Sequence, residues 1–60
     1  MNYKIINNIF EIREGDTLQI YDNNRWLDLG KINDKRRAAL DLNKHNFKVE
    51  GKPVRVIRVA

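Results

Sequence analysis

The C-terminal segment, residues 47–59, alternates apolar and charged side chains in two runs that are joined by a turn sequence. Lys48 and Glu50 separate apolar residues in the first run, which ends at Gly51, and the alternation resumes after Pro53. A period of two is typical of a half-buried strand. Glycine supplies the backbone freedom that a tight turn needs. These residues therefore predict a β-hairpin.

The alternation of the second run breaks at Val56-Ile57. Either the strand bulges at this point or both of its faces are partly buried. A bulge would turn Arg55 and Arg58 to the same side of the strand and would strengthen a basic surface. The other interpretation is an edge strand whose charges protect it from aggregation.

The first half of the chain contains short strand-like runs separated by turn residues. After the first run, Asn7-Asn8 forms either a two-residue turn or a bulge in a longer strand that continues to residue 13. This spacing predicts a meander of antiparallel strands. The strands are expected at residues 3–6, 17–21 and 25–30, with turns at residues 14–16 and 22–24.

Residues 35–46 contain no Gly, Pro or β-branched residue, which favours a helix. Asn33 and Asp34 are suitable N-caps, and Asn46 can end the helix in the left-handed conformation. A helical wheel places small and apolar residues on a stripe that can pack against a sheet. That stripe comprises Lys35, Ala38, Ala39 and Leu42, and the opposite side carries Arg36, Arg37 and Lys44 with Leu40 among them.

Together these elements predict a single α+β domain over residues 1–60. Its small antiparallel sheet combines the N-terminal meander with the C-terminal hairpin, and one helix packs on a face of that sheet. A chain of 60 residues without cysteine has no disulfide to stabilise it. We therefore expect self-association or stabilisation by a partner. The predicted core comprises Ile12, Leu18, Ile20, Trp26, Leu42, Phe47, Val49, Val54 and Val56.

Groups that carry catalysis are scarce in this sequence. It has no serine or cysteine, and Thr17 is its only aliphatic hydroxyl. His45 is the single imidazole, and the three glycines are isolated rather than gathered in a phosphate-binding loop. We therefore expect a protein that is not an enzyme and uses no metal or cofactor. No apolar run approaches the roughly 20 residues of a membrane span, and no signal peptide is recognisable, so a cytoplasmic location is expected.

Charge is distributed unevenly along the chain. Residues 1–30 carry three basic and five acidic side chains, whereas residues 31–60 carry nine basic and three acidic ones. Such asymmetry favours a polyanionic or acidic partner, with a solvated surface as the alternative. Trp26 is either a packing anchor or a platform for a base. The residues expected to contact nucleic acid or a protein partner are Lys35, Arg36, Arg37, Leu40, Lys44, Lys48, Lys52, Arg55 and Arg58.

The sequence also resembles a class of viral proteins. Asn, Ile and Lys fill about a third of it, Trp26 and Gly30 precede the alanine-bearing helix, and Val and Arg dominate residues 54–59. In these features it resembles the small accessory proteins of tailed bacteriophages. The resemblance implies binding to host machinery or to a host defence system in the host cytoplasm, and it assigns no residue a role.

Two hypotheses of function follow from the sequence. The first is a non-enzymatic module that binds nucleic acid, RNA or its backbone in particular. The alternative is a phage-type protein that binds and inhibits a host protein, either an acidic one or a ribonucleoprotein.

Overall fold

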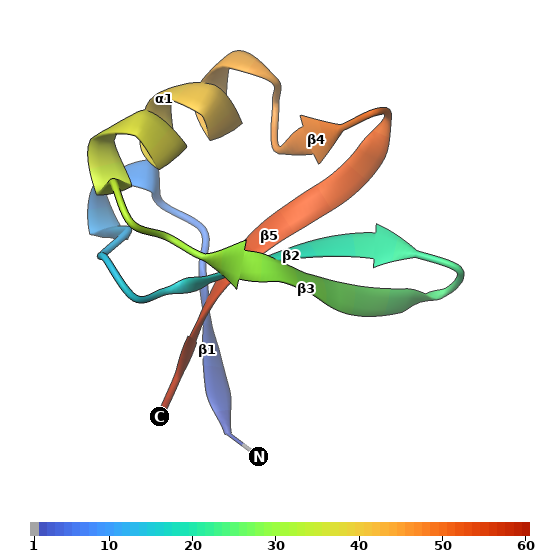
Figure 1. Ribbon diagram of the computed structural model, residues 1–60, viewed down its shortest axis with the longest axis horizontal. Coiled ribbons are helices and arrows are strands. Elements are labelled where there is room, and N and C mark those ends of the chain that lie inside the picture. The colour runs from blue at the N-terminus through green and yellow to red at the C-terminus, as the bar shows by residue number, and fades with distance from the viewer. Residues whose placement is uncertain (1) are drawn as a thin grey trace.

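The computed structural model describes residues 2–60 and shows one α-helix, one 3-10 helix and five strands (Figure 1). All paired strands are antiparallel, and α1 covers one face of the sheet, so the predicted α+β fold is confirmed. No helix of the described residues is long and apolar enough to cross a membrane. In chain order the elements are β1 (Tyr3–Ile6), η1 (Ile9–Glu11), β2 (Thr17–Asp22), β3 (Arg25–Lys31), α1 (Lys35–Lys44), β4 (Lys48–Val49) and β5 (Lys52–Val59).

The C-terminal strand β5 lies in the middle of the sheet. The strand order is β1-β5-β2-β3, and β4 pairs with the first residues of β5. Val56 is opposite Ile6 of β1 on one side and opposite Leu18 of β2 on the other. The interpretation of β5 as a charged edge strand was therefore wrong, because apolar residues from three strands meet across it.

The interrupted alternation in β5 does not produce a bulge. Its register with β1 and β2 is continuous, and both Val56 and Ile57 are buried. Of the two alternatives, partial burial of both faces is confirmed. Since side chains alternate along an unbulged strand, Arg55 and Arg58 lie on opposite faces of the sheet.

The connection after β1 follows neither of the two expected forms. The strand ends at Ile6, and the side chain of Asn8 accepts a hydrogen bond from the Phe10 N–H at 2.9 Å, which caps η1. An asparagine that satisfies a free N–H in this way begins a helical turn. This turn lifts Ile9 and Phe10 out of the sheet and places them beside α1.

The other turns and the helix agree with the sequence. Asn23 and Asn24 have φ angles of 53° and 63°, which form the two-residue turn between β2 and β3. The Asp34 carboxylate caps α1 by accepting from two backbone N–H groups at 3.1 Å. Asn46 has the expected left-handed φ of 54°, although α1 ends at Lys44, before the predicted end.

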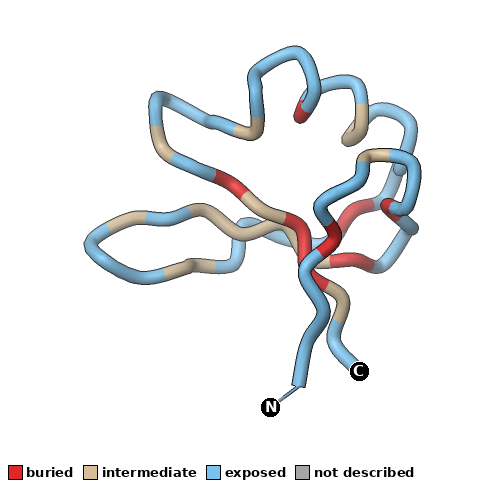
Figure 2. The backbone as a smooth tube through the Cα atoms, turned by 180° about the vertical axis from the view of Figure 1, so that it is seen from behind, coloured by how far each residue is buried: buried red, intermediate tan, exposed pale blue. Residues whose placement is uncertain are grey.

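The core lies between α1 and the inner face of the sheet, as the buried segments in Figure 2 show. Ala38 and Ala39 pack against it, and α1 lies closest to η1. Leu18, Ile20 and Phe47 are partly buried at its edge. Its buried members are Ile6, Ile12, Ile32, Leu42, Val54 and Val56.

Two predicted core residues lie elsewhere. Val49 is 42% exposed, because β4 has only two residues and lies at the end of the sheet. Trp26 is opposite Tyr21 in the β2–β3 ladder, one position away from the inward-facing Ile20. Its ring therefore lies on the outer face and is only partly buried.

Candidate binding surfaces

The basic side chains of the C-terminal half do not form one continuous surface. Arg58 lies on the inner face of the sheet and Arg55 on the outer face, whereas Lys35 and Arg36 lie beside η1. Two of these cations, Lys52 and Arg58, already have an acidic partner from the N-terminal half. The structure thus separates residues that the sequence suggested would act together.

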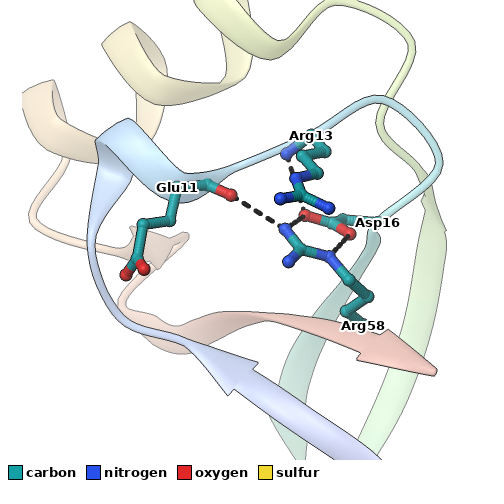
Figure 3. A network of polar contacts seen from close by, with 4 residues as sticks. All are labelled: Glu11, Arg13, Asp16 and Arg58. Carbon is teal, nitrogen blue, oxygen red and sulfur yellow. Dashed lines mark hydrogen bonds and ion pairs between the residues drawn. The ribbon is translucent and has the colours of Figure 1, made fainter. Parts of the chain in front are cut away.

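Arg58 holds a buried carboxylate (Figure 3). Its Nε donates to Asp16 Oδ1 at 2.8 Å and its Nη2 to Asp16 Oδ2 at 2.9 Å. Nη2 also donates to the Glu11 carbonyl, and the Arg13 N–H donates to Asp16 Oδ2. Asp16 is only 3% exposed, so this bidentate pair fastens the turn before β2 to the end of β5.

This arrangement perturbs both ionisable groups. The hydrogen bonds from Arg58 hold the pKa of Asp16 below its ordinary value of 3.8, although burial acts in the opposite direction. The same hydrogen bond raises the pKa of Arg58. The ion pair is therefore charged on both sides at neutral pH, and Asp16 offsets the positive charge of the guanidinium.

Two weaker ion pairs involve other predicted contact residues. Lys52 Nζ lies 3.3 Å from Asp22 Oδ1, and Arg37 Nε lies 3.7 Å from Asp41 Oδ2 on the same helix. The Lys52 pair, like the Arg58 pair, joins the basic half of the chain to the acidic half. Folding therefore offsets part of the charge asymmetry seen in the sequence.

The outer face of the sheet carries an aromatic cluster around Arg55, which we call the outer aromatic cluster (Tyr3, Gln19, Tyr21, Trp26 and Arg55). The Arg55 Cζ lies 4.2 Å from the ring centroid of Trp26 and 5.2 Å from that of Tyr3. The Tyr21 ring meets Trp26 edge-on, at 5.1 Å between centroids. These rings come from three strands and stay partly or largely exposed.

A polar chain holds Arg55 in this position. Its Nε donates to Gln19 Oε1 at 2.8 Å, and Gln19 Nε2 donates to Asp28 Oδ1 at 2.7 Å. The guanidinium is therefore oriented by a hydrogen bond at one edge while both rings contact it. A cation over an aromatic ring gains from the electrostatic field of the ring face. These contacts fix the Arg55 guanidinium between the two rings.

A second surface is the groove between η1 and α1, which we call the η1–α1 groove. It has a volume of about 420 Å³. Phe10 and Leu40 are 91% and 69% exposed at this groove. The residues that line it are Ile9, Phe10, Ile12, Lys35, Arg36, Ala39, Leu40 and Asn43.

A third candidate surface is a hollow of about 560 Å³ on the other side of α1. It lies between the helix, the end of β3 and β4. His45, Lys48 and Asp41 line it together with apolar residues that include Leu18 and Leu42. Across residues 2–60 no three metal-ligating side chains gather in one place. Lys44, the last residue of α1, lines none of the three hollows or clusters described.

Sequence reasoning missed two features that depend on strand pairing. Asp16 was expected only as part of the turn at residues 14–16, whereas its main side-chain partner is 42 positions away in the chain. Tyr3 was not expected beside Trp26, and β5 and β2 lie between the strands that carry them. The alternation of side chains along each strand indicates which residues share a face of the sheet. Using this signal to place Tyr3 beside Trp26 required knowledge of the strand order.

Comparison with protein-family models, with curated proteins and with solved structures finds no match for this chain. The resemblance to small phage proteins therefore stays a prediction, and a function is inferred below from the surfaces themselves.

Proposed function

We propose that this chain binds single-stranded nucleic acid through the outer aromatic cluster. The observation that carries the proposal is the contact of the Arg55 guanidinium with the rings of both Tyr3 and Trp26 on an exposed sheet face. Unpaired bases stack on aromatic rings and on guanidinium planes, and phosphates attract the cation. An antiparallel sheet face with this composition suits both parts of a nucleotide.

Single strands fit this surface better than duplexes do. Bases in a duplex are already stacked on each other, so their faces cannot reach the rings of Trp26 or Tyr21. The cluster offers π-faces and few directed donors or acceptors for base edges. We therefore expect binding that tolerates many sequences.

The charge arrangement sets the expected salt dependence. Arg37, Lys52 and Arg58 are in ion pairs, and Arg55 is the cation within the cluster. Each phosphate contact on a single strand contributes about −0.7 to the slope of log affinity against log salt. One or two contacts give a slope of roughly −0.7 to −1.4. A continuous basic surface with four or five contacts would give about twice that or more.

Trp26 is the only tryptophan, so its fluorescence reports directly on the proposed site. We would titrate the protein with a mixed single-stranded RNA, the same sequence as single-stranded DNA, and a duplex, at several salt concentrations. Quenching by the single strands and weak binding of the duplex are the expected results. Binding of the variants is followed with labelled oligonucleotides.

Trp26→Ala should weaken binding by about 5- to 150-fold, which corresponds to about 1–3 kcal/mol for one stacked base. Phe10→Ala is the matched control, because Phe10 is an exposed aromatic residue outside the cluster. It should leave the affinity unchanged. Absence of binding to any single strand at low salt, or equal affinities for Trp26→Ala and wild type, would reject the proposal.

A further inference from the structure

We infer that the η1–α1 groove is a docking site for an acidic amphipathic helix of another protein. This site lies beside α1, away from the outer sheet face, so the inference is independent of nucleic-acid binding. Three properties of the groove support the inference: its exposed apolar residues, two cations without a salt bridge within residues 2–60, and its boundary of two helical segments.

Only some of the apolar residues that line the groove pack against the core. Ile9 and Ala39 pack against the core, whereas Phe10 and Leu40 project beyond it and are mostly exposed. Asn8 caps η1 and so fixes the turn that carries Phe10. An exposed apolar patch with a polar rim is a common mark of an interaction surface. The groove volume of about 420 Å³ is within the range of binding clefts.

The rim of the groove is positively charged. Lys35 and Arg36 line it, and within residues 2–60 neither side chain forms a salt bridge. Two carboxylates accept hydrogen bonds from backbone N–H groups at the start of α1 and form no salt bridge with these two side chains. Asp34 caps the helix, and Glu14 accepts a hydrogen bond from the Lys35 backbone N–H at 3.3 Å. The complementary ligand therefore presents carboxylates beside apolar side chains.

A second copy of this chain fits the groove poorly. A two-fold interface places the same patch on both partners, so Lys35 and Arg36 would approach their own counterparts. The net charge of +4 adds further repulsion. A different protein with acidic residues avoids both costs. An amphipathic helix inserts apolar side chains spaced by three or four residues into such a groove, and its acidic flank would face Lys35 and Arg36.

The test begins with a displayed library of helical peptides in which apolar and charged positions are varied, selected against the intact protein. We expect enriched peptides to combine apolar anchors at helical spacing with Asp or Glu on one flank. Phe10→Ala should reduce their affinity by tenfold or more, as expected for an exposed anchor at the centre of an interface. Trp26→Ala should leave peptide affinity unchanged, just as Phe10→Ala should leave oligonucleotide binding unchanged.

A charge exchange makes the test specific to Lys35 and Arg36. The double variant Lys35→Glu, Arg36→Glu should lose the acidic peptides and should bind their counterparts in which Lys replaces the acidic residues. Enrichment of peptides without acidic residues, or equal binding of the acidic peptides by the double variant, would overturn the inference. So would a concentration-dependent dimer in ultracentrifugation that Phe10→Ala abolishes, because the groove would then belong to a second copy.

Discussion

The two faces of the sheet use the same residue types for different purposes. Arg58 on the inner face is held by a buried carboxylate and a backbone carbonyl, whereas Arg55 on the outer face is held by a neutral amide between exposed rings. The two arginines are three positions apart on one strand. Because side chains alternate between the two faces along a strand, the position of each arginine decides whether it stabilises the fold or is presented to solvent. Net charge alone does not reveal this difference.

Adjacent isoleucines in β1 give the largest contrast between the faces. Ile6 is 2% exposed on the inner face, and Ile5 is 49% exposed on the outer face. Ile6→Ala should cost about 2–5 kcal/mol because it leaves a cavity in the core. A chain of this length has a total stability of roughly 3–9 kcal/mol, so this variant should be largely unfolded or close to it. Ile5→Ala should cost less than about 1 kcal/mol. Urea unfolding followed by circular dichroism measures both, and equal losses would contradict the assignment of the faces.

The arginines provide the second contrast. Arg58→Met leaves the Asp16 carboxylate buried without its bidentate partner, so the melting temperature should fall well below that of wild type. Arg55→Met removes a cation from an exposed cluster and should lower the melting temperature much less. Thermal unfolding at neutral pH ranks the two variants. A lower melting temperature for Arg55→Met than for Arg58→Met would contradict the conclusion that the ion pair of Arg58 on the inner face stabilises the fold.

The Asp16–Arg58 pair also predicts how stability depends on pH. The pKa of Asp16 is lowered in the folded state, so its contribution is complete above the unfolded value near 3.8. It is lost as the pH falls through the lower, folded-state pKa, because the unfolded chain then binds the proton more readily. Melting temperatures of wild type should therefore decrease below about pH 4. Asp16→Asn should be less stable at neutral pH and should show a shallower decrease in acid. Parallel curves for the two proteins would show that Asp16 does not supply the effect.

Much of the fold could be predicted from local patterns. The alternation around Gly51 indicated the hairpin, the two asparagines after Asp22 indicated a turn, and the residue types after Asp34 indicated the helix. Each of these signals acts over a few residues, and each is confirmed. The central place of β5 could not be predicted in this way, because strand order depends on which apolar faces meet after collapse.

The candidate surfaces were only partly accessible to sequence reasoning. Lys35, Arg36 and Leu40 were expected to contact a partner, and the structure brings them together around one groove. Under the alternative of one longer strand that continues to residue 13, Phe10 would have lain within that strand. It instead projects from η1, which the Asn8 side chain caps. From its sequence context Trp26 could be a packing anchor or a platform for a base, and only its register opposite Tyr21 places its ring on the outer face.

The smallest expected effect concerns the support of Arg55 on the outer face. Gln19 accepts from Arg55 and donates to Asp28, and all of these groups are at least partly exposed. Gln19→Ala should therefore change stability by no more than about 0.5 kcal/mol. If the outer aromatic cluster binds single strands, the variant should lose a few-fold in affinity, less than Trp26→Ala, because the guanidinium is then less well oriented. Asn43→Ala is the control, since Asn43 is an exposed amide in the η1–α1 groove. A loss of oligonucleotide affinity with Asn43→Ala but not with Gln19→Ala would move the nucleic-acid site from the outer face to the groove.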